Sequence, residues 1–125
     1  MAEEQAWRIV FYIDGRGNSP VEEFLKGLDL KTQARFDYSI RQLQALNTRV
    51  GEPLVKHIEG KLWELRRESG TNIYRVFYFF YTGRRIVFLH GFQKKSQKTP
   101  RREIETAQRR MEDFLQRADE GGEER

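Results

Sequence analysis

Cysteine is absent from this sequence, and histidine, proline and long apolar runs are scarce. Without cysteine the chain forms no disulfide and offers no thiolate, which fits a reducing compartment. The longest apolar run, Val76 to Tyr81, is far shorter than the ~20 residues that span a bilayer. The N-terminal stretch MAEEQAW is acidic and lacks the apolar segment of a secretory signal. We therefore expect a cytoplasmic protein without membrane association.

The usual motifs of metal, nucleotide and serine chemistry are also missing. The two histidines, His57 and His90, do not form a pair with metal-ligand spacing such as HxH or HExxH. No glycine-rich phosphate-binding motif follows a predicted strand, and no serine lies in a GxSxG turn. We expect neither a metal site nor a cofactor.

Positive charge, by contrast, is concentrated in one segment. The net charge is only +4, yet residues 84–102 contain seven lysines and arginines and no carboxylate. A concentrated patch attracts polyanions, whereas scattered charge of the same sum mainly aids solubility. A solvated surface run is the alternative interpretation.

The length and the hydrophobic pattern predict one α+β domain. The 125 residues are 38% hydrophobic and 13% aromatic, which is enough for a single core. We expect the domain to cover residues 1–118 and the polar residues 119–125 to form a disordered tail. The expected element order is β-α-α-β-β-β-α.

Alternation and helical spacing give the approximate bounds of these elements. Strands are predicted at Trp7 to Ile13, Lys61 to Arg66, Ile73 to Tyr81 and Ile86 to Phe92, and helices at Pro20 to Leu28, Leu30 to Asn47 and from Thr99 onward. Residues 54–60 are ambiguous and are interpreted as a loop or extended segment. The three consecutive strands favour an antiparallel meander with Ile73–Tyr81 at its centre. The helices are expected to cover one face of the sheet, leaving the other for function.

Two arginines within predicted strands require an explanation, because an unpaired buried guanidinium is costly. Arg75 lies inside an aromatic run, and Arg66 shares a face of its strand with Glu64. Either arginine pairs with Glu64, or it lies on an open face and binds an anion. Both can hold at once, since Glu64 can orient an arginine that still contacts phosphate.

Basic residues also follow the last strand. Lys94 and Lys95 are adjacent, and repulsion between neighbouring ammonium groups lowers the pKa of one of them, which makes it a better proton acceptor. The alternative is a flexible basic loop that only attracts phosphate. His90 is an acid or base candidate near neutral pH, although a lone histidine in a strand is more often structural.

Three segments, KLWELR, IYRVFYFF and LHGFQKKSQKTP followed by REIE, together resemble the RelE/ParE superfamily of toxins from bacterial toxin–antitoxin pairs. They are most similar to its phage-derived-protein branch, labelled HigB-like. The resemblance runs from the first strand to about Leu115 and is densest from Gly60 to Arg110. It implies a small microbial ribonuclease fold, an antiparallel sheet with two helices on one face and a C-terminal helix.

The resemblance also implies a function. RelE and HigB members cut messenger RNA on the ribosome and stop translation, and a cognate antitoxin, often a HigA-like helix-turn-helix protein, neutralises them. Carried over by motif, the catalytic candidates are Arg75, Lys94 and Lys95, followed by Arg66. His90 is a reserve acid or base. The expected RNA-binding residues are Lys98, Lys61, Arg84, Arg85, Arg101 and Arg102. Many relatives carry a tyrosine on the C-terminal segment, but this chain has none after Tyr81.

The residues and the resemblance agree on metal-independent RNA cleavage, in which the 2′-hydroxyl attacks the phosphate and arginine and lysine assist. Two other functions remain open. A ParE-like toxin would share the fold but inhibit DNA gyrase and leave translation running. An inactive toxin-fold module would bind a partner without affecting messenger RNA.

Overall fold

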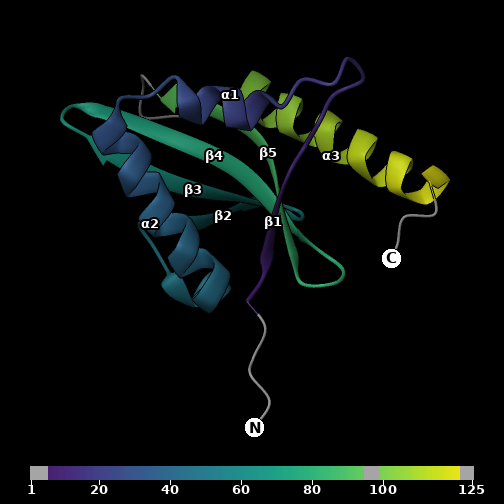
Figure 1. Ribbon diagram of the computed structural model, residues 1–125, viewed down its shortest axis with the longest axis horizontal. Coiled ribbons are helices and arrows are strands. Elements are labelled where there is room, and N and C mark those ends of the chain that lie inside the picture. The colour runs from purple at the N-terminus through teal and green to yellow at the C-terminus, as the bar shows by residue number, and fades with distance from the viewer. Residues whose placement is uncertain (1–5, 95–98, 122–125) are drawn as a thin grey trace, which may run out of the picture.

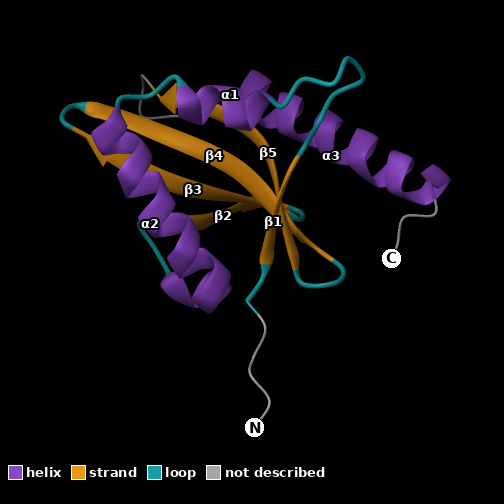
Figure 2. Ribbon diagram, in the orientation of Figure 1, coloured by secondary structure: helices purple, strands orange, loops and turns teal. Residues whose placement is uncertain are grey.

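A five-stranded sheet forms the centre of the protein (Figure 1, Figure 2). The computed structural model describes residues 6–94 and 99–121. Within them the order is β1 (Arg8–Phe11), α1 (Pro20–Lys26), α2 (Leu30–Leu46), a 3-10 turn (Asn47–Val50), β2 (Val55–Glu59), β3 (Leu62–Ser69), β4 (Asn72–Tyr81), β5 (Arg85–Lys94) and α3 (Arg101–Gly121). The α+β class predicted from the sequence is confirmed.

The predicted element order was wrong at one place. Residues 55–59 form strand β2, which pairs antiparallel with β3, where the sequence was ambiguous and predicted a loop or extended segment rather than a strand. Only Val55 of this edge strand is buried, and its polar residues give it no alternating apolar pattern. Its pairing with β3 therefore depends on the tertiary fold, which local propensity does not report.

The sheet is mixed rather than wholly antiparallel. The strand order is β1-β5-β4-β3-β2, with β4 at the centre, where its length and aromatic content predicted it. Strands β2 to β5 form an antiparallel meander, but β1 pairs parallel with β5, from Arg8 opposite Arg85 to Phe11 opposite Phe88. The crossover through α1 and α2 permits this parallel pairing, because it carries the chain from one edge of the sheet to the other.

The helices cover both faces of the sheet, which corrects the prediction that they share one. Helices α1 and α2 pack through Val21, Phe36 and Leu43 on a face formed by Val76, Phe88 and other alternate strand residues. Helix α3 packs on the opposite face, through Ile104, Ala107 and Met111. These three residues recur at helical spacing, so a single stripe of α3 meets the sheet.

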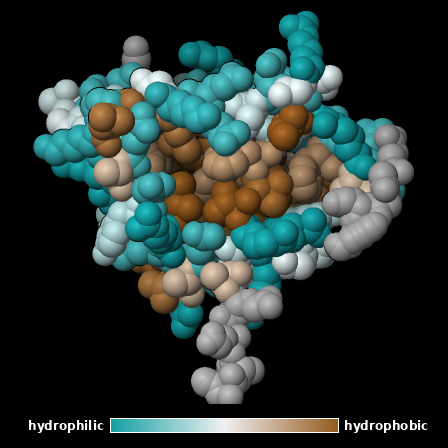
Figure 3. All heavy atoms as spheres, viewed as in Figure 1, coloured by the Kyte–Doolittle hydropathy of each residue, from teal (hydrophilic) through white to brown (hydrophobic). Residues whose placement is uncertain are grey.

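Apolar side chains remain visible in a hollow between α1 and α2 (Figure 3).

Helix α3 continues to Gly121, past residue 118 where the sequence predicted the domain to end, and residues 122–125 lie outside the described part. Within residues 6–94 and 99–121, no helix combines the length and apolar character needed to cross a bilayer.

Gly91 on β5 allows α1 to lie close to the sheet. A Cβ at this position would come within 2.8 Å of Cγ of the Phe24 ring, which α1 places against the strand. Real Cβ atoms do not approach so closely, so a side chain here would push the aromatic ring away. The glycine in the LHGF run is therefore explained by packing.

We expect Gly91→Ala to lower the free energy of unfolding by about 1–3 kcal/mol, the usual effect of overpacking a core. Urea denaturation measures it. Gly15→Ala is the matched control, because a Cβ there meets nothing within 4 Å. Equal stability of the two variants would contradict this account of Gly91.

Candidate functional site

Three rows of cross-strand neighbours form a charged surface on the face of the sheet that α3 covers. One row contains Lys56 on β2 and Glu64 on β3. The next contains Arg66 on β3 and Arg75 on β4, directly opposite each other. The third brings Lys94 of β5 beside Ile73. Because residues two apart along a strand point to the same face, these charged groups lie on one side of the sheet.

These charged groups line a pocket of about 330 Å³. Its lining residues are Glu52, Pro53, Lys56, Ile58, Glu64, Arg66, Arg75, Lys94 and Thr99. Four of them are cations and two are carboxylates. The structure thus brings together three residues predicted from the sequence, namely Arg66, Arg75 and Lys94. Lys95 and Lys98, which were predicted beside them, lie outside the described residues.

A buried ion pair lies beneath this pocket. Nη1 of Arg75 donates to Oε2 of Glu64, and the two residues are only 6% and 1% exposed. Within the described residues, Oε1 of Glu64 and Nε of Arg75 are buried without a hydrogen-bond partner. Burial raises the pKa of the Glu64 carboxyl, and the charge of Arg75 opposes that rise. Arg75 is therefore paired with Glu64, one of the two partners that the sequence left open.

Arg66 has a different partner. Its Nη2 lies 2.5 Å from Oε2 of Glu68, two residues further along β3, and its side chain is 28% exposed. Like charges directly opposite each other in an antiparallel pair repel, so the facing of Arg66 and Arg75 is unfavourable without nearby anions. Glu64 and Glu68 supply this compensation in the free protein. A bound phosphate would supply more.

Lys94 lies at the rim of the pocket, at the end of β5. Partial burial lowers the pKa of its ammonium group, and the positive charge of Arg75 lowers it further. Arg66 and Lys56 act in the same direction, while Glu64 opposes them. A lysine with a lowered pKa is neutral more often at a given pH, so it accepts a proton more readily. The main cause of the lowered pKa is burial, and cations on neighbouring strands add to it.

Among the lining residues that the sequence reasoning missed are Lys56 and Thr99. Lys56 was assigned to a loop, yet β2 places it directly opposite Glu64. Thr99 was predicted to begin the last helix, but α3 begins at Arg101 and Thr99 lines the pocket. No pattern in the sequence indicates either position, because each reaches the pocket only through the tertiary fold.

His90 lies away from this pocket, between β5 and α3. Phe77 is its cross-strand neighbour and separates it from Glu64. Its Nε2 is 2.6 Å from Oε1 of Glu103, and its Nδ1 is 3.1 Å from Nη1 of Arg110. An arginine only donates, so Nδ1 accepts and the proton of the neutral ring lies on Nε2. The histidine joins α3 to the sheet.

The remaining predicted RNA-binding residues are spread over the protein. Lys61, Arg84 and Arg85 lie in or beside turns at the other end of the strands from Arg75, since Arg85 pairs with Tyr81 and Arg75 pairs with Phe92. The guanidinium of Arg85 lies over the Tyr81 ring. Arg101 forms two hydrogen bonds of 2.9 Å with the Glu59 carboxylate. Arg102 is exposed on α3.

The described residues contain no group of three or more metal-ligating side chains close enough to hold a metal ion. What the pocket offers instead is a cluster of guanidinium and ammonium donors around a small concavity. Such donors recognise phosphate, and arginine does so through two parallel hydrogen bonds. The fold and the pocket thus define a small α+β protein with a cationic, phosphate-compatible site on its sheet.

Comparison with known proteins identifies the family. Residues 23–112 match the family described as phage derived protein Gp49-like (DUF891). The chain is also 38% identical over 96 residues to the "Probable endoribonuclease HigB1" of two Mycobacterium tuberculosis strains, CDC 1551 / Oshkosh and ATCC 25618 / H37Rv. Each alignment covers 76% of this chain and 72% of the relative. The chain belongs to this Gp49-like family, the HigB-like toxin branch that the sequence motifs predicted.

The buried ion pair gives a prediction about stability. Arg75→Met leaves the Glu64 carboxyl buried without its partner, so we expect the free energy of unfolding to fall by about 3–5 kcal/mol. The double variant Glu64→Leu/Arg75→Met removes both charges and should recover most of that loss. Denaturant titration of the parent, the single and the double variant measures this. A double variant less stable than the single one would contradict the pairing.

His90 gives a prediction about pH. Burial lowers the pKa of its imidazole below the ordinary value of 6.5, although the hydrogen bond to Glu103 opposes this. The unfolded chain therefore takes up this proton before the folded protein does, and stability is lost as the pH falls from 6.5 through the folded-state pKa. We expect the free energy of unfolding to decline less between pH 7.5 and 5.5 in His90→Gln than in the parent. Equal declines would show that His90 does not contribute.

Proposed function

We propose that this protein is the toxin of a type II toxin–antitoxin pair and a metal-independent endoribonuclease that cuts messenger RNA on the ribosome. The observation that carries this proposal is the pocket in which Arg66, Arg75 and Lys94 converge over a buried carboxylate. The relative named as an endoribonuclease supports the same reaction. The proposed partner is a HigA-like helix-turn-helix antitoxin.

The proposed reaction begins at the 2′-hydroxyl of the ribose. Its oxygen attacks the adjacent phosphorus, the bond from phosphorus to the 5′-oxygen breaks, and the products are a 2′,3′-cyclic phosphate and a 5′-hydroxyl. One group must take the proton of the 2′-hydroxyl, and another must give a proton to the leaving 5′-oxygen. Cations must stabilise the additional negative charge on the phosphate oxygens in the transition state.

The residues of the pocket suit these roles. Arg66 is the more accessible arginine and would bind the phosphate directly, exchanging part of its contact with Glu68. Arg75 is held by Glu64, so its guanidinium is already oriented before RNA binds. Lys94 would be the base or the acid, a role that its lowered pKa favours. Lys95 is the second candidate for proton transfer, and Lys98 would contact the RNA backbone.

The cation cluster suggests how Lys94 and Lys95 would divide the roles of base and acid. Only one of them needs to be neutral at a time, because a base and an acid hold opposite protonation states. The charges of Arg66, Arg75 and Lys56 favour the neutral form of Lys94. This favours Lys94 as the base, and Lys95 is the candidate for the acid. Ribosome dependence fits a site of this kind, since the ribosome would orient the RNA.

We expect Lys94→Gln to reduce messenger cleavage by about 100-fold or more, because general acid–base catalysis contributes about that much. Arg66→Gln should reduce it by about 100-fold through loss of phosphate binding. The measurement is primer-extension mapping of a translated messenger with purified ribosomes. Arg75 is unsuitable for this test, since its loss also destabilises the fold.

Arg41→Gln is the matched control for this experiment. Arg41 lies on α2 with its side chain 75% exposed, and its ion pair with Asp37 is a surface contact. It should retain the activity of the parent. Full cleavage by both Lys94→Gln and Arg66→Gln at equal protein concentration would show that the site is wrong. Growth arrest with intact messenger and damaged DNA would instead indicate the gyrase-inhibiting alternative.

A further inference from the structure

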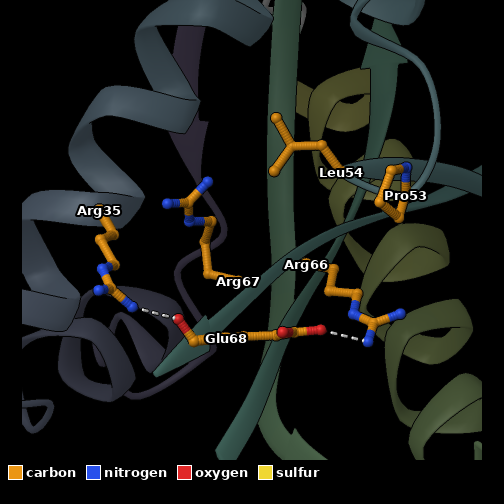
Figure 4. Close-up of a pocket in the computed structure, with 6 residues that line it drawn as sticks. All are labelled: Arg35, Pro53, Leu54, Arg66, Arg67 and Glu68. Carbon is orange, nitrogen blue, oxygen red and sulfur yellow. Dashed lines mark hydrogen bonds and ion pairs between the residues drawn. The ribbon is translucent and has the colours of Figure 1, made fainter. Parts of the chain in front are cut away.

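A second cationic pocket adjoins the proposed catalytic one. It has a volume of about 340 Å³ and lies between α2 and the outer edge of β3. Its lining residues are Arg35, Pro53, Leu54, Arg66, Arg67 and Glu68 (Figure 4). Arg66 and Pro53 line both pockets. We propose that this second pocket binds a further phosphate of the same RNA strand; this rests on the proposed function.

The geometry of β3 creates the pocket. The pairing of β2 with β3 reaches only as far as Val55, the first residue of β2, which lies opposite Leu65. The last hydrogen bond on this edge of β3 runs from the Arg66 N–H to the Leu54 carbonyl over 2.8 Å. Beyond that point β3 continues to Ser69 and, among the described residues, pairs only with β4. Arg66 and Arg67 are consecutive, so their side chains point to opposite faces of the strand. The edge between them is open.

Arg67 has a buried hydrogen-bond donor that an anion in this pocket could satisfy. Its Nε is buried and has no hydrogen-bond partner among residues 6–94 and 99–121. A buried donor without an acceptor loses its hydrogen bond to water and gains none in return, which is unfavourable. In Figure 4 its guanidinium lies on the α2 side of β3, on the same side as Arg35. An anion in the pocket would give this donor the acceptor that it lacks.

The charges in the pocket favour an anion. Three arginines face one carboxylate, that of Glu68, which is already engaged by Arg66 at 2.5 Å. Arg35 from α2 donates to the backbone carbonyl of Glu68 over 2.7 Å, so it is held close to the pocket while several of its donors remain available. Guanidinium groups arranged in this way bind phosphate oxygens.

An extended peptide pairing with the free edge of β3 is the competing occupant. Such a strand would need the backbone carbonyl of Glu68 as an acceptor, but Arg35 occupies it. A phosphate needs only donors, and the pocket supplies them. Because Arg66 and Pro53 line both pockets, the pockets adjoin, and a strand with one phosphate beside Arg75 would pass Arg66 toward Arg67. A single nucleic-acid strand therefore fits the observations better.

The test is the binding of uncleavable RNA, measured by fluorescence anisotropy with 2′-O-methyl oligonucleotides of three and eight nucleotides. The methyl group removes the nucleophile, so binding is read without cleavage. In Arg67→Gln and in Arg35→Gln, the affinity for the longer oligonucleotide should fall about tenfold at 0.1 M salt. The slope of the logarithm of the binding constant against the logarithm of the salt concentration should decrease in magnitude by about 0.7 for each arginine removed. This is the value for one phosphate contact on a single strand.

The short oligonucleotide should bind these variants as it binds the parent, because it occupies only the first pocket. Arg41→Gln is the matched control and should bind both lengths normally. Arg67→Lys, which keeps the charge, should recover part of the loss and guards against a folding defect, which thermal unfolding of each variant also checks. Unchanged binding of the long oligonucleotide by Arg67→Gln would overturn the proposal.

Three further outcomes would also overturn it. The first is an equal loss of affinity for both oligonucleotide lengths, and the second is a parent protein that binds eight nucleotides no better than three. The third is a peptide that binds the parent and loses affinity in Arg67→Gln while RNA binding stays intact. The catalytic proposal fails separately. If Lys94→Gln cleaves normally while Arg67→Gln still loses length-dependent binding, the second pocket stands and the catalytic assignment does not.

Discussion

The buried pairing of Glu64 with Arg75 is the interaction on which the charged surface depends. Four strands, β2 to β5, bring cations to one face of the sheet, and two of these cations, Arg66 and Arg75, lie directly opposite each other. Without a carboxylate beneath them, such a cluster would oppose the packing of β3 on β4. Glu64 makes the arrangement tolerable, and it fixes the guanidinium of Arg75 in one orientation. Burial lowers the pKa of Lys94, and the neighbouring cations lower it further, so the charged surface also contributes to the proposed chemistry.

The position of α3 determines where this surface stays open. The helix covers the same face of the sheet through Ile104, Ala107 and Met111, and His90 is held beneath it by Glu103 and Arg110. On that face β3, β4 and β5 contribute Arg66, Arg75 and Lys94 to the first pocket, whereas the second pocket lies between α2 and the edge of β3. This face of the sheet thus has an apolar part that packs against α3 and a charged part that lines the pocket. This division explains why His90, although close in sequence to Lys94, belongs to the packing of the helix.

Much of the fold could be predicted because the local sequence pattern of most elements is enough to identify them. The apolar and aromatic runs of β4 and β5 and the helical spacing of Ile104, Ala107 and Met111 identify their types without any knowledge of neighbours. Strand β2 gives no such signal, because one buried valine in a short edge strand produces no period. The parallel pairing of β1 with β5 and the placement of α3 on the second face are long-range choices. No local propensity encodes them.

The sequence by itself determined the kinds of residue available for function, namely arginines within strands, lysines after the last strand and no cysteine. It also determined the family, through motifs that span most of the chain. Only the tertiary structure decided which cations meet. It joined Arg66, Arg75 and Lys94 with the unforeseen Lys56, and it sent Lys61, Arg84 and Arg85 to the other end of the sheet. Strand register makes that choice, because cross-strand neighbours are far apart in sequence and a shift of one residue would turn each side chain to the opposite face.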